Sequence, residues 1–276
     1  MIWHRGAIFP DDALLVPVSD RSLEHGLGLF ETTRTWSGRP ALLDRHRSRL
    51  FRSAAELGLT IRPEDWPTEP DVARLLEAEG ASGDRVLRIT ATGGTGLGPS
   101  LVWMNTRPLP RPLRPAAIVQ VGSWAVDRNE PMARHKALNY WSRRLAFERA
   151  SASALDESLS LGDGRIWEGS RTNLFVIAGD RLMTPSTRGP IVPGIMRALV
   201  LASAPETGLL VEEVDGVGPA DLRDATEVFL SNAVRGIIPV GRVVDHDGAA
   251  VFDRPAPGPW TARLRTIVEA KIGGSP

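Results

Sequence analysis

The stretch Arg134-His-Lys-Ala-Leu-Asn-Tyr-Trp-Ser-Arg-Arg-Leu-Ala-Phe147 decides the fold. Its first residues are typical of the end of an extended segment, and from about Asn139 the apolar residues recur at helical spacing. Lys136 is therefore expected at a junction rather than on an exposed helix. Most lysines are solvated surface charges. What points to chemistry at this lysine is a second run downstream, Trp167-Glu-Gly-Ser-Arg-Thr-Asn-Leu-Phe175.

The bulk composition describes a globular protein without a strong global field. The chain has 276 residues, of which 42% are hydrophobic and 24% charged, and its 33 basic residues balance 33 acidic ones. Nothing here indicates a nucleic-acid or membrane partner. There is no cysteine, so disulfides and thiolate chemistry are excluded. No apolar run approaches the length of a membrane span, and the default expectation is a cytoplasmic protein.

The histidines give no metal motif. The chain has five, and no two of them fall at the His-x-x-x-His spacing that a helix uses to bind zinc. The sequence therefore predicts that the protein binds no metal.

A proline-rich run divides the chain. The segment Arg107-Pro-Leu-Pro-Arg-Pro-Leu-Arg-Pro115 cannot be helical and predicts a stiff linker. We expect a small N-terminal domain over 1–110 and a larger β-rich domain over 116–276. In the first, Leu14–Val18 predicts a short strand, and 42–58 predicts an amphipathic helix with Asp44 as its N-cap. In the second, several short strands separated by glycine turns predict a partly barrel-like sheet.

The two quoted runs together resemble the fold-type IV pyridoxal-phosphate enzymes. These are the branched-chain aminotransferases, the D-amino-acid aminotransferases and the 4-amino-4-deoxychorismate lyases. In that family a Lys-x-x-Asn-Tyr-like segment carries the Schiff-base lysine, and a Glu-Gly-x-x-x-Asn-x-Phe segment about thirty residues later carries the acid that faces the pyridine nitrogen. The resemblance implies an α+β protein with a small α/β domain and a larger pseudo-barrel domain that carries the lysine. It assigns Lys136 as the catalytic residue and Glu168 as the acid.

Further residues match the family's binding positions for the cofactor, pyridoxal 5'-phosphate. The resemblance implies that Arg49 binds the phosphate, and a guanidinium fork suits that group. It implies the same for the helix start at Gly194, Ile195 and Met196, although a plain helix start would leave the same sequence. The loop Ser231-Asn-Ala233 resembles the one that completes the phosphate site. Tyr140 matches the tyrosine at the cofactor's ring oxygen, or is a core aromatic.

The substrate follows less directly. Phe30-Glu-Thr-Thr-Arg34, the helix entrance at Leu42 and the Ser231-Asn-Ala233 loop favour a lyase that converts 4-amino-4-deoxychorismate to 4-aminobenzoate and pyruvate in folate biosynthesis. The alternative is an aminotransferase of the same fold, acting on branched-chain or D-amino acids or amines. A cofactor-free binding protein on this scaffold is the third hypothesis.

The residue that binds the substrate carboxylate is not evident. Many relatives place an arginine near residue 91, where this chain has Ala91, Thr92 and Thr95. Arg34 and Arg107 are the candidates that remain. The resemblance also implies a homodimer.

Overall fold

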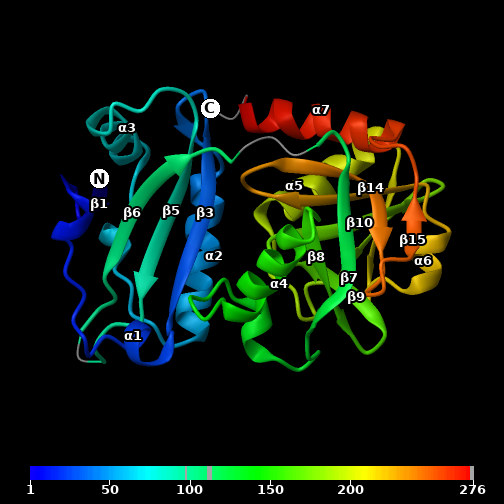
Figure 1. Cartoon of the computed structure of the whole chain (residues 1–276). Coiled ribbons are helices and arrows are strands. Elements are labelled where there is room, and N and C mark those ends of the chain that lie inside the picture. The colour runs from blue at the N-terminus through cyan, green and yellow to red at the C-terminus, as the bar shows by residue number, and fades with distance from the viewer. Residues whose placement is uncertain (97, 111–113, 274–276) are drawn as a thin grey trace. The chain divides into compact units, whose positions relative to one another are not determined.

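The structure is a computed structural model that describes residues 1–96, 98–110 and 114–273 (Figure 1). The chain forms two compact units. The described residues of Met1–Pro110, His135–Asn139 and Ile272–Pro276 make up unit 1, and those of Arg111–Arg134 and Tyr140–Lys271 make up unit 2. The predicted linker is in part strand, because β6 runs to Pro108, and its residues 111–113 lie outside the described part.

Unit 1 is built on a six-stranded antiparallel sheet in the order β2-β1-β6-β5-β3-β4. The strands β3 and β5 are largely buried, and the ladder between them extends from Gly28 opposite Thr92 to Arg34 opposite Val86. The strand bounds are Ile2–His4 (β1), Ala7–Phe9 (β2), Gly28–Trp36 (β3), Arg39–Pro40 (β4), Arg85–Thr92 (β5) and Val102–Pro108 (β6).

The helices of unit 1 are α1 (Arg21–His25), α2 (Leu43–Glu56) and α3 (Glu69–Ala78). Helix α2 packs against β3 and buries Leu43, Leu50 and Ala54, as its amphipathic sequence predicts (Figure 1). The predicted cap at Asp44 is wrong. The N-cap is Leu42 in a left-handed conformation with φ 54°, and Asp44 lies in the first turn. Helix α3 is closed at its start by Thr68 and Asp71, which bond to each other's backbone amides.

No strand forms at Leu14–Val18, so that prediction is also wrong. Pro17 has no amide to donate to a ladder, and its carbonyl accepts from Asp20 in a turn. The side chains of Leu15 and Val18 are 82% and 86% exposed, so the segment has no buried face to hold it in a sheet.

The segment that carries Lys136 lies along β3. Phe30 donates its amide to the Lys136 carbonyl and Leu138 donates to the Gly28 carbonyl, both at 2.9 Å. Gly28 has φ +143°, and a Cβ there would lie 2.7 Å from both the Ala91 carbonyl oxygen and the Leu138 side chain. Only glycine fits this approach. These bonds explain why residues 135–139 group with unit 1, whereas the sequence led us to expect Lys136 in the second domain.

Unit 2 contains a nine-stranded sheet in the order β12-β11-β10-β13-β14-β7-β8-β9, with β15 beside β14. Strand β9 also pairs with β10, so six strands close into a barrel. The predicted α+β fold with a barrel-like second part is confirmed. The strand bounds are Ala117–Ala125 (β7), Glu157–Gly162 (β8), Arg165–Gly169 (β9), Asn173–Ala178 (β10), Arg181–Pro185 (β11), Leu210–Val214 (β12), Glu227–Asn232 (β13), Gly236–Val244 (β14) and Ala250–Asp253 (β15).

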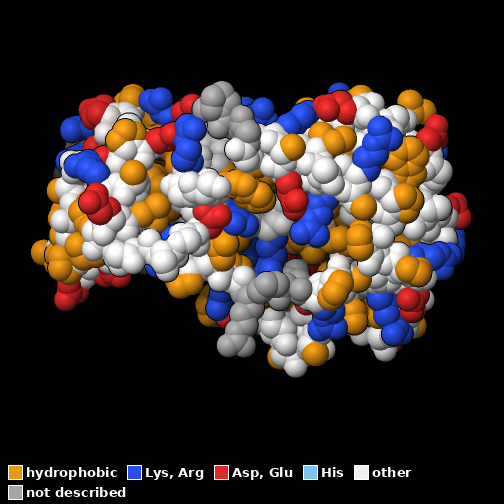
Figure 2. All heavy atoms as spheres, turned by 90° about the horizontal axis from the view of Figure 1, so that it is seen from above, with side chains coloured by type: hydrophobic (Ala, Val, Ile, Leu, Met, Phe, Trp, Pro, Cys, Tyr) orange, Lys and Arg blue, Asp and Glu red, His pale blue; other side chains and the backbone are white. Residues whose placement is uncertain are grey.

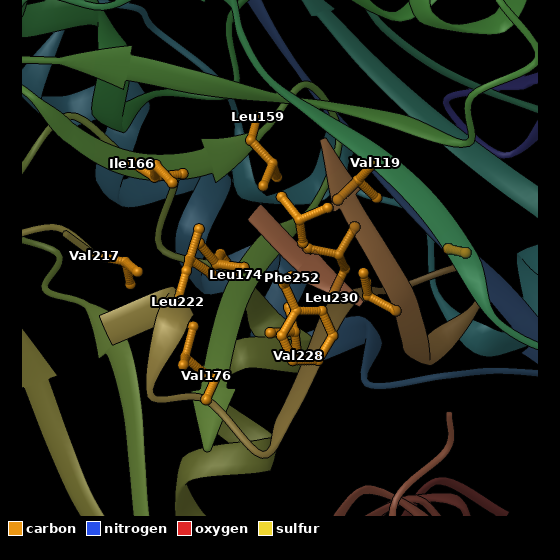
Figure 3. Close-up of a cluster of buried hydrophobic side chains, with 14 of the residues drawn as sticks. Val119, Leu159, Ile166, Leu174, Val176, Val217, Leu222, Val228, Leu230 and Phe252 are labelled. Atoms are coloured by element: carbon orange, nitrogen blue, oxygen red, sulfur yellow. The ribbon is translucent and has the colours of Figure 1, made fainter. Parts of the chain in front are cut away.

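The barrel surrounds a dry core. Figure 3 shows Val119, Leu159, Leu174, Val228 and Leu230, from four different strands, pointing toward one another. All are 1% exposed or less. The sheet is accompanied by α4 (Trp141–Ala152), α5 (Ile195–Ser203), α6 (Pro219–Arg223) and α7 (Pro259–Gly273). Burial of this apolar surface is the main stabilising term for the barrel.

On the face drawn in Figure 2, basic and acidic side chains are interspersed within each unit. This agrees with the equal totals of the two signs. In the part of the chain that the structure describes, every helix is too short or too polar to span a membrane.

Candidate functional site

Lys136 in unit 1 is a partly buried lysine at the junction that the sequence predicts. The backbone bonds to β3 fix its position, and its Nζ lies 4.3 Å from the centre of the Phe30 ring. The preceding residue, His135, is held by a 3.0 Å hydrogen bond between its Nδ1 and Ser53 Oγ of α2. The side chain is therefore carried by a rigid segment with an aromatic face beside it.

Arg49 belongs to a buried charged cluster with Glu31 and His46. Its Nε and Nη2 donate to the two carboxylate oxygens of Glu31 at 2.8 and 2.5 Å, and His46 Nδ1 lies 2.7 Å from Glu31 Oε2. Burial opposes the charge on Glu31, but Arg49 and His46 outweigh it and lower the pKa of Glu31 to about 2. The position of Arg49 on α2 is as predicted, and its fork is oriented by an acid that the sequence did not single out.

Two effects disfavour the charged form of His46 in this cluster. Burial lowers the pKa of His46, and the positive charges of Arg49 and Lys136 act in the same direction against Glu31. Its Nε2 is buried without a hydrogen-bond partner among the described residues.

In unit 2, Glu168 stands in a row with two polar residues on adjacent strands. Glu168 at the end of β9 pairs with Asn173 of β10, and Asn173 pairs with Ser231 of β13. Directly opposed residues point to the same face of a sheet, so the three side chains share one face. All three are at most 6% exposed. The predicted residues Glu168 and Ser231 are thus brought together, although they are far apart in the chain.

The carboxylate of Glu168 accepts several donors. Arg143 Nη2 donates to its Oε1 at 2.5 Å, the Val192 amide donates at 3.1 Å, and Asn173 Nδ2 donates at 3.3 Å. The Arg143 guanidinium also lies over the Trp124 ring, 5.1 Å from its centre. Burial disfavours the cation, yet the charge of Glu168 raises the pKa of Arg143 above its ordinary value. Glu168 is therefore held as a buried, hydrogen-bonded anion.

Tyr140 precedes α4 and keeps its proton. Its hydroxyl donates to the Ser170 carbonyl at 2.6 Å. Burial raises the pKa of Tyr140 to about 12, and Glu168 adds to the rise against the opposing charge of Arg143. A neutral phenol with its proton committed to a carbonyl offers its oxygen lone pair to a further donor.

The start of α5 adjoins this row. Gly194 is the N-cap, and a Cβ on it would lie 1.9 Å from Asn173 Oδ1, so the helix start and β10 are in close contact. Asn173 Nδ2 also donates to the Val192 carbonyl at 3.0 Å. The first amides of a helix, here those of Ile195 and Met196, have no acceptor inside the helix and attract anions.

The β13–β14 turn places the remaining predicted phosphate residues. Ser231 Oγ is buried and has no hydrogen-bond partner in the described part of the chain, which suits a site that an acceptor completes. The Oδ1 of Asn232 accepts from the amides of Val234 and Arg235 and stabilises the turn. Ala233 lies in that turn, partly buried.

The two candidate carboxylate-binding arginines, Arg34 and Arg107, belong to unit 1. Arg34 Nη2 bonds to Asp84 at 3.1 Å, and its guanidinium lies over Trp36. Arg107 is exposed on β6 opposite Val86.

Sequence reasoning missed Arg143, Asn173 and Glu31. Asn173 is part of the quoted motif, and its position at the start of a predicted strand could have indicated that it lies beside Glu168. For Arg143 the sequence offers only two adjacent arginines on a helix, and spacing does not say which of them meets an acid.

The comparisons with known proteins agree with this geometry. The family model described as amino-transferase class IV matches residues 28–243. The D-alanine aminotransferase of Bacillus licheniformis is 27% identical over 98% of this chain and 96% of its own length. Among solved structures, the branched-chain aminotransferase of the thermophilic archaeon Thermoproteus uzoniensis, with norvaline, gives a TM-score of 0.83 at 26% identity, covering 99% of this chain and 94% of that one.

A third similarity bears on the lyase hypothesis. A protein from Legionella pneumophila, described as a candidate 4-amino-4-deoxychorismate lyase, gives a TM-score of 0.80 at 25% identity and covers 93% of this chain and 95% of that one. The family model alone spans well over half of the sequence. The chain belongs to the class IV aminotransferase family.

Proposed function

We propose that this chain is a pyridoxal-phosphate aminotransferase that acts on D-amino or branched-chain amino acids. The observation that carries the proposal is the buried row of Glu168, Asn173 and Ser231 beside the start of α5. A held anion suits a protonated ring nitrogen at one end of the row. The unpartnered hydroxyl of Ser231 among the described residues and the helix amides suit a phosphate. The names of the D-alanine and branched-chain relatives support the choice of substrate.

The lysine content supports the role of Lys136. The chain has 33 basic side chains, and Lys136 and Lys271 are its only lysines. An arginine cannot replace a lysine whose neutral amine must bond to a carbonyl carbon. Lys271 bonds to Ser203 and Glu206, which gives it a structural role. A lysine kept at the junction beside β3 is therefore expected to do chemistry.

The residues would divide the work as follows. Lys136 binds the cofactor and then carries the substrate's proton. Glu168, oriented by Arg143, would hold the proton on the ring nitrogen, and Tyr140 would bind at the ring oxygen. The phosphate would be bound by Arg49, the amides of Ile195 and Met196 after Gly194, and the turn at Ser231, Asn232 and Ala233. When bound, the cofactor supplies an electron sink for the charge left on the substrate carbon.

A paired assay tests the activity. The purified protein with cofactor is mixed with D-alanine or leucine in the absence of a 2-oxo acid, and the absorbance is followed for conversion to pyridoxamine phosphate. Separately, it is mixed with 4-amino-4-deoxychorismate. We expect conversion with an amino acid and no 4-aminobenzoate. Release of pyruvate and 4-aminobenzoate without pyridoxamine phosphate would refute the aminotransferase proposal.

The lyase remains the second candidate because of two observations. The Phe30-Glu-Thr-Thr-Arg34 strand and the Ser231-Asn-Ala233 turn resemble the lyases, and the Legionella pneumophila structure supports that resemblance. The aminotransferase is favoured because the sequence relative from Bacillus licheniformis and the solved structure from Thermoproteus uzoniensis are both named aminotransferases. The second half of the paired assay decides between them.

A homodimer is also proposed. Three large apolar side chains that are close in sequence are mostly exposed: Leu15 (82%), Val18 (86%) and Leu23 (61%). Exposure of apolar surface to water is unfavourable, and burial against a second copy of the chain would remove that cost in free energy. Light scattering at micromolar concentration should give twice the chain mass of 29.9 kDa. A single-chain mass would contradict the proposal. The cytoplasmic location stays a prediction.

A further inference from the structure

The sheet of unit 1 carries a partly buried arginine, Arg88, on the face opposite α2. Phe30 and Thr32 are two positions apart on β3, and Arg88 of the neighbouring β5 lies directly opposite Thr32 (Figure 1). These three side chains therefore share one face of the sheet. Glu31 points to the other face, where it bonds to two residues of α2. Arg88 and Phe30 thus lie together on the side of the sheet away from that helix.

The Phe30 ring links Arg88 to Lys136. Arg88 Cζ lies 3.8 Å from the centre of this ring, and Lys136 Nζ lies 4.3 Å from the same centre. Two groups this close to one point are at most about 8 Å apart. The ring is only 5% exposed and is fixed by the ladder between β3 and β5. A small molecule at the Lys136 amine is therefore within reach of the Arg88 guanidinium.

This separation suits an α-amino acid. In such a molecule the amine nitrogen and the carboxylate carbon are about 2.5 Å apart, and a guanidinium carbon lies about 4 Å from a carboxylate carbon when two parallel hydrogen bonds join them. An amino acid whose amine takes the place of the Lys136 amine therefore needs a guanidinium about 6–7 Å from that amine, or nearer. The limit that the Phe30 ring sets for Arg88 includes this distance.

Two other arginines on the same face, Arg34 and Arg107, are less well placed. Both lie one row further along the sheet than Arg88. Arg34 is four positions from Phe30 on β3, which is about 13 Å in a strand, and its guanidinium bonds to an acid and lies over a tryptophan ring. Arg107 is exposed. Of the three, Arg88 is the one that the Phe30 ring links to Lys136.

We propose that Arg88 binds the carboxylate of the amino-acid substrate and of its 2-oxo-acid product. The inference rests on the proposed function and names a specificity residue of that same site. A planar guanidinium binds a carboxylate through two parallel hydrogen bonds, which fixes the orientation of the substrate as well as its affinity. An amine without a carboxylate lacks this contact, so Arg88 favours amino acids over simple amines.

The test compares Arg88→Gln with a matched control, Arg85→Gln. Arg85 is a partly buried cation of the same strand, three positions away, which points to the opposite face of the sheet and pairs with Glu79. Arg88→Met is a second variant in case Arg88→Gln does not fold, because its unbranched apolar side chain can stay against the Phe30 ring. Arg88→Lys keeps the charge and removes the fork.

The probes are propionate and 4-methylpentanoate, which have the carbon skeletons of alanine and leucine without the amine. The amides of both acids serve as their uncharged counterparts. Ligand-observed NMR on the holoenzyme measures the dissociation constants of the probes, and an absorbance titration measures cofactor affinity. Steady-state kinetics compare D-alanine and leucine with isopentylamine, which is leucine without its carboxylate.

Arg88→Gln and Arg88→Met should bind the acids about ten- to a hundredfold more weakly than wild type, which is the usual effect of a charge-assisted contact. The affinities for the amides and the cofactor, and all values for the control, should stay within about twofold. The KM for the amino acid should rise by a similar factor while kcat changes less, and the kinetics with isopentylamine should not change. Arg88→Lys should recover part of the affinity, which separates lost charge from a displaced ring.

Four outcomes would overturn the inference. The first is unchanged binding of both acids in the Arg88 variants, or no binding of either acid by wild type. The second is an equal loss of affinity in Arg85→Gln. The third is an equal loss for the acids and their amides, which would mean that Arg88 only supports the Phe30 ring. The fourth is a loss of cofactor affinity with unchanged binding of the acids, which would assign Arg88 to the phosphate.

The inference and the proposed function can fail separately. A wild-type chain that binds the acids through Arg88 but converts no amino acid would refute the proposed function alone. A chain that converts amino acids with the same KM in wild type and in Arg88→Gln would refute this inference alone.

Discussion

Arg143 offers the sharpest test of how the acid at 168 is held. Replacing it with methionine keeps the length of the side chain and removes the charge. The pair is buried, with side chains 12% and 3% exposed, and the atoms are 2.5 Å apart. Removing one partner of such a pair costs about 3–5 kcal/mol because the other charge is left uncompensated. Glu168 keeps its bonds from Val192 and Asn173, so we expect the lower end, about 3 kcal/mol.

Hydrogen exchange on peptides from β9 and β10 is the suitable assay, since a chain with two units need not unfold in one step. The loss of stability in Arg143→Met should be smaller at acidic pH, because protonation of Glu168 removes its uncompensated charge. The double variant Arg143→Met with Glu168→Gln should be more stable than Arg143→Met alone, because it leaves no lone ion.

Arg144→Met is the control for this prediction. It removes a neighbouring exposed ion pair and should change stability by less than about 0.5 kcal/mol. The reasoning is refuted if Arg143→Met stays within about 0.5 kcal/mol of wild type, or if the double variant loses the sum of the two single losses.

The remaining predictions concern the other parts of the site. The pKa of Glu31 is lowered to about 2, so the stability that its charge contributes is present above about pH 4.5 and is lost as the pH falls toward 2. Glu31→Gln should therefore cost about 3 kcal/mol at pH 7 and make stability less dependent on pH between these two values. An unchanged dependence of stability on pH in this range would contradict the prediction. Gly194→Ala should weaken cofactor binding at least about tenfold by displacing the helix start, with Gly98→Ala, which meets open space, as control in the same absorbance titration. Borohydride reduction of the holoenzyme should label Lys136 and leave Lys271 unlabelled in the peptide masses, and label on Lys271 alone would exclude Lys136 as the attachment residue.

Local patterns predicted much of the fold. Helix α2 and strand β5 followed from apolar spacing, because each buries one face against its own unit. The segment Leu14–Val18 looked like a strand by composition, yet Pro17 and the lack of a buried face prevented pairing. The cap of α2 also failed, since Leu42 adopts a left-handed turn that no side-chain pattern announces.

Some site residues could be predicted from local sequence patterns and others could not. Glu168 and the start of α5 could be predicted because each belongs to a short contiguous motif. Their partners could not. Arg143 reaches Glu168 from 25 positions earlier and Glu31 binds Arg49 from 18 positions earlier, contacts that depend on how strands and helices pack. The placement of Lys136 in unit 1 likewise depends on the ladder with β3, which spans the predicted domain boundary.

The strand β12 is the last of the sheet in unit 2 and lies beside β11 alone in that order. Leu210 and Val211 on it are 61% and 39% exposed, so its outer backbone groups and apolar side chains together form a template for pairing with another chain. Two acids follow at once, Glu212 bonded to Arg181 and Glu213 to Arg197. An intermolecular β-sheet at this edge would have to bury these charges, so we expect them to oppose pairing with another chain there.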